Sequence, residues 1–512
     1  MAGDQQPYWW ERPAFLWLVI ALAGVPLWLP AVPPLTDFPG HMGRYFIQLE
    51  GARSADLARW YAVDWSWIGN LGVDLLVQLM GPILGVEVAS KLIIVTIPMV
   101  AAAGFLLAAR EVHGRVPPTA FFALPLAYSY PFLWGFVNYA LSMALAFLAF
   151  ALWLRLGRAG RTLLRFCLFL PLSLAIWTVH IFGWAALIVL VGSAEIVASR
   201  PFYRGWFRRI GRTILALLCL LPPLALLLLR FGAGGAGGQP WARVWFHEDL
   251  KQRWVESIFR DRWEVFDKAS LWLLAAVLLM ALGRWLWVRR APSGGPLILA
   301  ALIFAGLFAL LPHALLGSAY ADMRLAPYAL ATALLAIGPL GPAGRWFALA
   351  SLGFFLLRLG GTGLSMAAYD QSYRAELAAL DHLPKGARLL TLVGKPCAPG
   401  WAVHRLDHLP SLALIRKGAF ANDQWDAAGA QVIRVRYPAA GAFASDPSQF
   451  VVEPRCARSE RTAFDRALAD FPRTAFDYVW IIRQPAGRYD LSGLRPVWRN
   501  GSSALFRVVT TE

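Results

Sequence analysis

Charged residues are scarce in this 512-residue chain: Asp, Glu, Lys and Arg make up 15% of it, whereas 58% of it is hydrophobic. A soluble domain carries roughly a quarter charged residues, so the composition excludes an ordinary soluble enzyme. Cysteine is scarcer still. Four cysteines without a CxxC spacing exclude a disulfide scaffold and argue against a structural zinc site.

Acids are the rarer of the two charges, with 31 Asp and Glu against 48 Lys and Arg, which gives a net charge of +17. In a soluble protein this excess would indicate nucleic-acid binding. In a membrane protein the same excess can instead set the topology, so the position of each basic residue has to be considered first.

Long apolar stretches recur along the first two-thirds of the chain, at lengths suited to crossing about 30 Å of hydrocarbon. We predict eleven membrane spans, at 14–32, 88–109, 117–133, 136–154, 163–179, 181–198, 213–231, 269–288, 297–312, 325–342 and 346–362. The segment 72–86 is interpreted as re-entrant or surface-bound, because Asp74 and Gln78 interrupt it and Gly81-Pro82 breaks it. An odd number of spans puts the two termini on opposite sides.

Arginines mark one side of the membrane. The connections at 110–116, 155–165, 199–212 and 284–290, together with Arg12 and Arg345, hold 16 basic residues. The same face has four acids, Asp4, Glu11, Glu111 and Glu195, whereas the opposite loops before residue 363 are neutral overall. By the positive-inside rule these connections are cytoplasmic, and the charge needs no nucleic acid to explain it. The first span lacks a clear cleavage site, so it is a retained anchor. We therefore predict a multi-pass bacterial inner-membrane protein with a cytoplasmic N-terminus and a periplasmic C-terminal region.

The composition changes after about residue 365. Apolar residues alternate at 388–393, 432–435, 478–482 and 504–509, as in strands, and helical patterns occur near 371–382 and 459–471. We predict a transmembrane domain over 1–365 and a soluble periplasmic α/β domain over 366–512. Cys397 and Cys456 both lie in this second domain, either as a disulfide or as two free or buried thiols.

Two outer loops of the transmembrane domain are long. The first, 33–71, carries Pro34-Leu35-Thr36-Asp37-Phe38-Pro39-Gly40-His41 and then a partly amphipathic helix. The second, 232–268, begins with a glycine-rich run and continues with Trp and Phe interleaved with charges. This pattern is typical of a helix in the membrane interface, and the glycine run leaves a mobile lid as the alternative.

Ionisable and polar side chains that could carry chemistry gather on the outer face by this topology, and such groups near a membrane tend to mark function. The members of this group are Asp37, His41, Arg44, Asp64, Asn70, Asp74, Asn138, His180, His313, Tyr320, Asp322 and Arg324. Of these, the site candidates are Asp37, His41, Arg44, Asn138, His180, Tyr320, Asp322 and Arg324. Each has a simpler interpretation as well. Asp37 could only cap the helix that follows, Arg44 and Arg324 could only anchor to lipid headgroups, His180 could be a buried structural residue, and Asp322 could pair locally with Arg324.

The layout resembles the GT-C fold of integral-membrane glycosyltransferases: about eleven spans, an Asp in the first outer loop directly after the first span, interface helices in that loop, and a C-terminal periplasmic α/β domain. The resemblance covers essentially the whole chain. It implies transfer of a sugar from a polyprenyl-phosphate carrier to an acceptor hydroxyl, with inversion, and it implies that Asp37 is the general base.

Two departures limit the acceptor. Asp37 is followed by Phe38 and not by a second acid, unlike the Asp-Glu pair of protein mannosyltransferases. The C-terminal region also lacks the Trp-Trp-Asp-Tyr-Gly run of oligosaccharyltransferases. Both departures disfavour protein glycosylation and favour a lipid-linked or polysaccharide acceptor.

Chemistry of this kind needs a base at the acceptor hydroxyl and positive charge at the departing phosphate. We expect Asp37 to be the base. Arg44, Arg324 and His180 are the expected contacts of the lipid phosphate, with His41, Asn138, Tyr320 and Asp322 as further substrate-binding candidates. The expected partners are a polyprenyl-phosphate-linked sugar, a lipid or glycan acceptor and membrane lipids. No DxD-type cluster is present, so no metal or other cofactor is predicted.

Three other interpretations remain open. A lipid or polysaccharide flippase would show inverted repeats and polar residues at mid-membrane, which the sequence does not show. An O-antigen ligase or polymerase would need outer-loop Arg and His but no essential Asp37. A non-catalytic sensor would use the C-terminal region for binding alone.

Overall fold

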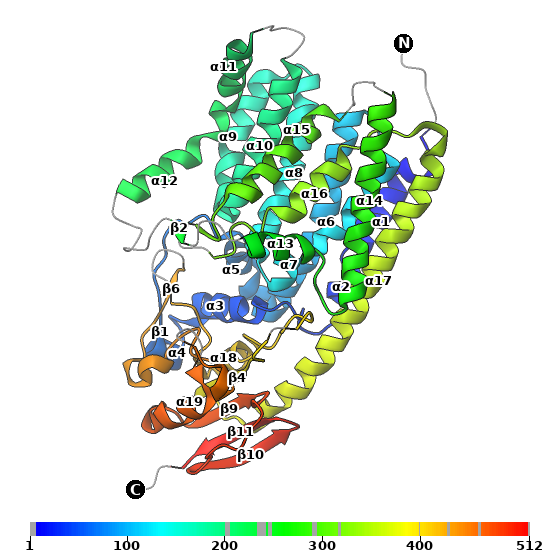
Figure 1. Ribbon diagram of the computed structural model, residues 1–512. Coiled ribbons are helices and arrows are strands. Elements are labelled where there is room, and N and C mark those ends of the chain that lie inside the picture. The colour runs from blue at the N-terminus through cyan, green and yellow to red at the C-terminus, as the bar shows by residue number, and fades with distance from the viewer. Residues whose placement is uncertain are drawn as a thin grey trace. The chain divides into compact units, whose positions relative to one another are not determined.

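The computed structural model describes residues 7–199, 205–232, 242–243, 248–288, 294–315, 319–398, 400–426, 431–458 and 462–509 (Figure 1). The chain forms two compact units. The helical unit comprises Met1–Leu29, Trp67–Val73 and Ile93–Leu364, and the sheet unit comprises Pro30–Ser66, Asp74–Leu92 and Ser365–Glu512. The predicted glycine-rich run at 232–238 lies outside the described residues, except for Gly232.

Long apolar helices dominate the helical unit. Among the described residues, six helices are long and apolar enough to cross a membrane: α6 (Val86–His113), α8 (Val137–Arg158), α9 (Thr162–Val179), α10 (Ile181–Ala198), α14 (Glu264–Val288) and α17 (Gly344–Leu377). At a rise of 1.5 Å per residue, even an 18-residue helix is about 27 Å long, which nearly matches the hydrocarbon layer. The chain is therefore a multi-pass membrane protein.

The remaining apolar helices are shorter or bent. A pair at Trp206–Leu220 and Pro222–Leu228, in α11 (Trp206–Leu217) and α12 (Pro222–Gly232), bends by 73° and would make a seventh span if counted as one. The shorter helices are α1 (Pro13–Leu22), α5 (Gly72–Leu84), α15 (Gly295–Leu310) and α16 (Ala326–Leu335). Ten of the eleven predicted stretches contain one of these long, bent or short apolar helices.

The exception is the predicted span at 117–133. It forms a 3₁₀ helix, η2 (Pro118–Tyr128), followed by the short helix α7 (Tyr130–Trp134), and every residue of η2 is buried. Pro117, Pro118 and Pro125 explain the difference, because proline has no N–H to donate and interrupts regular α-helical hydrogen bonding. The segment is apolar because protein surrounds it.

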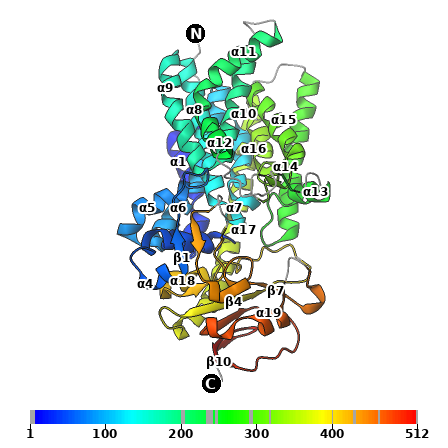
Figure 2. The same cartoon turned by 90° about the vertical axis from the view of Figure 1, so that its left-hand side faces the viewer.

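Helix α10 is at the centre of the packing in the helical unit, where it contacts α8, α9, α11 and α15 (Figures 1 and 2). Gly183 permits its close approach to α8, since a Cβ at this position would lie 2.4 Å from the carbonyl oxygen of Ser142. Small residues at helix interfaces are a common way to bring transmembrane helices together.

The sheet unit is built on a mixed sheet with strand order β10-β11-β9-β4-β7-β8, and β5 pairs with β4. Its strands are β4 (Arg388–Gly394), β5 (Phe420–Ala421), β7 (Phe450–Val452), β8 (Thr462–Ala463), β9 (Tyr478–Ile482), β10 (Leu494–Asn500) and β11 (Ser503–Val508). Strand β4 is parallel to β5, β7 and β9. Strand β11 is antiparallel to both of its neighbours, β9 and β10. Helix α19 (Phe464–Asp470) packs against β7 and β8 (Figure 2).

The predicted α/β character of the C-terminal region is confirmed. Strands β4, β9 and β11 lie where the alternating patterns were found, and α19 falls inside the predicted helix at 459–471. The fourth pattern forms β6 (Ile433–Val435), which pairs with β1 (Tyr61–Val63) and not with the main sheet.

The first outer loop folds together with the C-terminal residues. Helices α3 (Phe38–Glu50) and α4 (Ala55–Trp60) contribute Ile47, Leu57 and Trp60 to the same hydrophobic core as residues of β4, β9 and β11. Burial of a large apolar side chain is worth about 1.5–3 kcal/mol, so these contacts stabilise the unit as a whole. The prediction assigned the loop 33–71 to the transmembrane domain, whereas Pro30–Ser66 lies in the sheet unit.

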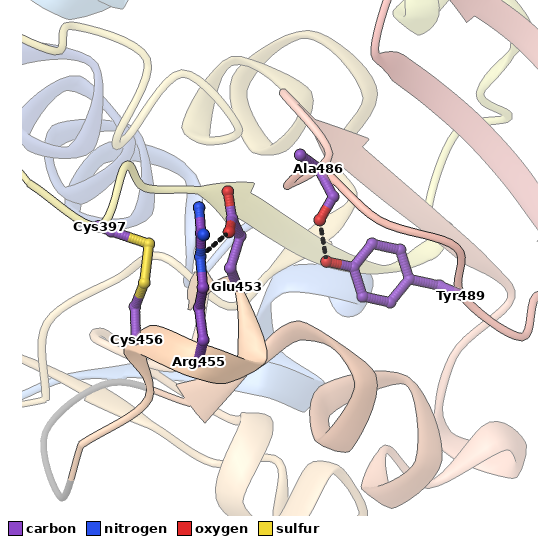
Figure 3. The surroundings of a disulfide bond; sticks show 6 residues. All are labelled: Cys397, Glu453, Arg455, Cys456, Ala486 and Tyr489. Atoms are coloured by element: carbon purple, nitrogen blue, oxygen red, sulfur yellow. Dashed lines mark hydrogen bonds and ion pairs between the residues drawn. A yellow bond between two sulfur atoms is a disulfide. The ribbon is translucent and has the colours of Figure 1, made fainter.

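Cys397 and Cys456 form a disulfide with a Cα–Cα distance of 5.5 Å (Figure 3). Beside it, the Arg455 guanidinium pairs with Glu453 at 2.7 Å. The remaining two cysteines are free, with Cys167 exposed and Cys219 buried. Of the two states left open by the sequence, the structure has the disulfide.

Replacing both Cys397 and Cys456 with Ser is expected to destabilise the sheet unit by about 2–4 kcal/mol, because the bond closes a loop of 59 residues and so restricts the unfolded chain. Thermal unfolding of the purified protein in detergent measures this loss, and Cys167→Ser is the matched control. Equal unfolding midpoints for the double variant and the wild type would contradict the prediction.

Candidate active site

Asp37 lies at the N-terminus of α3 in the sheet unit, and 15% of its side-chain surface is exposed. Its side chain makes no capping hydrogen bond to the helix, although its backbone carbonyl accepts from the His41 N–H at 3.0 Å. Capping is therefore not the role of this carboxylate. Its Oδ1 instead faces the Nε2 atom of His408 at 3.8 Å.

Burial is the main electrostatic influence on Asp37. It raises the pKa of this carboxyl group from its usual 3.8 to about 7, against the opposing attraction of His408 and with a further rise from Asp407 and Asp446. A carboxylate with a pKa near neutrality is well suited to accept a proton in a reaction at neutral pH. At neutral pH the Asp37 carboxyl group is therefore divided between its protonated and its ionised form.

His41 and His408 both pack against one aromatic side chain. The ring of Trp425 is 4.9 Å from the His41 ring and 4.3 Å from the His408 ring, measured between centroids. Gly40 makes this packing possible, since a Cβ there would come within 2.8 Å of the Trp425 ring. The sequence placed His41 near Asp37, and the structure adds Trp425 and His408 to the same site.

Arg44, one turn further along α3, is held by an acid. Its guanidinium donates two hydrogen bonds to Asp74, at 2.9 and 2.8 Å, and a third to the Gln431 side chain at 2.7 Å. Gln48 also donates to Asp74, at 2.8 Å. With 1% of Arg44 exposed, this geometry favours a structural ion pair over the expected contact with a phosphate.

In the helical unit, His180 and Arg324 lie close together. Nδ1 of His180 accepts from the Phe182 N–H at 3.2 Å and so caps α10. The Arg324 guanidinium lies over the rings of Phe136 and Phe182, at 4.5 and 5.3 Å, and the Tyr139 hydroxyl donates to the Arg324 carbonyl. These are cation–π contacts, and the guanidinium carries the positive charge that a contact with a phosphate requires.

A second polar group in the helical unit contains Asp322 and Tyr320. Asp322 pairs with Lys251 at 2.9 Å and with Nδ1 of His313 at 3.3 Å. The Tyr320 ring lies edge-on to His313 at 4.9 Å, and its backbone has a φ of 60°, which is unusual for a residue with a side chain. Lys251 was not a predicted site residue, because nothing in its local sequence distinguishes it from a surface lysine.

Asn138 has a structural position. Its Oδ1 accepts from the Val73 N–H at 2.6 Å and its Nδ2 donates to the backbone and side chain of Asn70, at 2.9 and 3.0 Å. These bonds hold the segment Trp67–Val73 onto α8, and they occupy both ends of the amide. Asn138 thus serves this packing.

Among the described residues, one group of His, Cys, Asp and Glu side chains has the spacing of metal ligands: Cys397, Glu453 and Cys456. Its two sulfurs are bonded to each other, so it does not offer thiolates to a metal. The absence of a metal from the mechanism stays a prediction.

No protein-family model matches the sequence, and no curated protein matches it either. Solved structures do match. The crystal structure of ArnT from Cupriavidus metallidurans in the apo state shares 13% identity with this chain, covers 96% of it and 97% of its own length, and has a TM-score of 0.53. The crystal structure of the same protein bound to undecaprenyl phosphate has the same identity and coverage and a TM-score of 0.50. The chain has a GT-C-like fold. At 13% identity the likeness establishes the fold alone, so any role for the candidate site residues has to be argued from their geometry in this chain.

Proposed function

We propose that this protein is an inverting membrane glycosyltransferase that uses a polyprenyl-phosphate-linked sugar as donor and a periplasmic lipid-linked or polysaccharide acceptor. The observation that supports this most strongly is the state of Asp37, at the start of the first outer-loop helix of a GT-C-like fold. Its carboxylate makes no capping hydrogen bond to that helix, and its pKa is about 7. Its protonation equilibrium suits the removal of a proton from an acceptor hydroxyl.

The reaction is a single displacement at the anomeric carbon. Asp37 takes the proton of the acceptor hydroxyl while the hydroxyl oxygen forms a bond to the anomeric carbon. The bond from that carbon to the phosphate oxygen breaks, and the electron pair leaves with the polyprenyl phosphate. Attack opposite the leaving group inverts the configuration at the anomeric carbon.

Departure of the lipid phosphate needs a cation, and Arg324 is the proposed one, with His180 as a second contact. The ArnT structure with undecaprenyl phosphate supports a donor of this lipid class. Arg44 is left out of this role because Asp74 already neutralises it. His41 and Trp425 offer planar surfaces against which a sugar ring can pack.

The orientation follows from the charge of the loops. The basic connections lie on the cytoplasmic side of a bacterial inner membrane by the positive-inside rule, which puts the first outer loop and the C-terminal residues in the periplasm. The disulfide supports that compartment, since disulfides persist in oxidising surroundings.

The test is a transfer assay with the purified full-length protein, radiolabelled polyprenyl-phosphate sugars and a membrane-lipid and glycan extract as acceptor. Loss of label from the donor, with its appearance in an acceptor, is the expected result. If the label instead crosses the bilayer of proteoliposomes while it remains on its lipid, the protein is a flippase and the proposal is wrong.

A further inference from the structure

His408 is a buried histidine from the segment before α18 (Ser411–Lys417), with 4% of its side chain exposed. Its Nδ1 lies 3.0 Å from the backbone carbonyl oxygen of Asp423. A carbonyl oxygen only accepts hydrogen bonds, so Nδ1 carries a proton and donates it. The nitrogen that can gain or lose a proton is consequently Nε2.

Nε2 faces two carboxylates at equal distance. Oδ1 of Asp37 and Oδ1 of Asp446 each lie 3.8 Å from it, and they come from α3 and from the loop before β7. These distances are short enough for strong electrostatic attraction and leave room for the small rearrangement that a direct hydrogen bond needs. A positive charge on the His408 ring therefore attracts the candidate base and a second acid alike.

The charges around His408 are mostly negative. Asp423 lies 4.0 Å from Nδ1 and is itself held by the Ser411 N–H and hydroxyl, at 2.9 and 2.7 Å. Asp407 lies next in sequence, and its carboxylate is paired with Lys395. Burying several carboxylates is costly unless a cation accompanies them, and the imidazolium form of His408 supplies that cation.

The balance of these groups favours the charged imidazole. Burial disfavours it, but the carboxylates of Asp446, Asp37, Asp423 and Asp407 together raise the pKa of His408 above its usual value. The attraction between His408 and Asp37 also lowers the pKa of Asp37, and it is the main effect that opposes the rise caused by burial. His408 therefore limits how far burial can protonate the base.

We propose that His408 is a positioning residue of the transfer reaction, whose imidazolium keeps Asp37 ionised and directs its free oxygen toward the acceptor hydroxyl. This inference rests on the proposed function. It assigns a role in catalysis to a residue of the C-terminal part of the chain, and it gives Asp446 the role of the second acceptor that fixes the orientation of the ring.

His408→Asn is the variant that separates charge from packing, because the Asn amide can still donate to the Asp423 carbonyl while it carries no charge. We expect the acidic limb of the pH profile of transfer to move up by about one pH unit, since an opposite charge within 4–6 Å shifts a pKa by 1–3 units. At pH 7 the ionised fraction of Asp37 falls from about one half to about one tenth, so the rate falls about fivefold. The rate recovers at higher pH, while KM for the lipid donor stays unchanged. His404→Asn, a half-buried histidine next to Arg483, is the matched control.

An unchanged pH profile in folded, active His408→Asn protein overturns the inference and leaves the proposed function standing. Inactivity of the wild type overturns the proposed function, and the contact is then tested without turnover. Protein labelled with ¹⁵N-histidine is titrated by NMR as wild type and as Asp37→Asn. Loss of the Asp37 charge is expected to lower the midpoint of the His408 signal, and an unmoved midpoint overturns the inference. This second measurement also decides the matter if His408→Asn does not fold.

Discussion

Asp37→Asn is expected to abolish sugar transfer, with a loss of roughly 10²- to 10⁴-fold, the range that a positioned general base contributes. The amide is nearly isosteric with the carboxyl group but cannot take a proton from the acceptor hydroxyl. Binding of the polyprenyl-phosphate donor does not need that proton transfer and stays near the wild-type level. The measurement is the initial rate of transfer at saturating donor, together with donor binding to the purified variant.

Stability distinguishes loss of the base from loss of the fold. The pKa of Asp37 is about 7 in the folded protein and near 3.8 in the unfolded chain, so the unfolded chain releases the proton more readily. The wild type therefore loses stability as the pH rises from about 4 to 7, and Asp37→Asn removes that loss. We expect the variant to unfold at the same temperature as the wild type or higher at pH 8.

Asp64→Asn is the control, because Asp64 is an exposed acid of the same outer segment. It should leave both rate and stability unchanged. Near-normal turnover by Asp37→Asn at every pH would show that another group accepts the proton, and an O-antigen ligase-like mechanism without an essential Asp37 would then be the better description.

The sequence predicts the membrane part well because length and apolarity decide it. Ten predicted stretches contain long, bent or short apolar helices. The one at 117–133 differs because its prolines interrupt regular α-helical hydrogen bonding. The strands β4, β9 and β11 were predictable from alternation over five or more residues. Strands β5, β7 and β8 have two or three residues and gave no pattern, whereas the three-residue β6 lies within a predicted alternating run.

The site was only half predictable. Asp37 is identifiable because an acid directly after an apolar span is unusual. His408 is not, since Leu406-Asp407-His408-Leu409 is ordinary for a soluble segment, and only the folding of α3 against α18 brings it to Asp37. The pairing of β1 with β6 was likewise invisible, because strands distant in sequence carry no local record of their partners.

Asp74→Asn is expected to be the most destabilising single substitution in the sheet unit among those considered, at about 3–5 kcal/mol. It leaves the guanidinium of the buried residue Arg44 without the carboxylate that accepts two of its hydrogen bonds. Glu50→Gln removes the acid of an exposed pair with Arg53 near the end of the same helix, and such pairs contribute roughly 0–1 kcal/mol. Thermal unfolding of the two variants measures the contrast, and equal midpoints would contradict a structural role for Arg44.

The double variant Arg44→Gln with Asp74→Asn separates the two interpretations of Arg44. Removing both charges leaves no uncompensated ion, so most of the lost stability should return, as expected for two residues in direct contact. If Arg44 is only the structural partner of Asp74, the double variant is folded and transfers sugar at close to the wild-type rate. If Arg44 contacts the lipid phosphate, the double variant is stable but inactive, and donor binding weakens with it. The structure favours the first outcome, because the Asp74 carboxylate already occupies the face of the guanidinium that a phosphate would need.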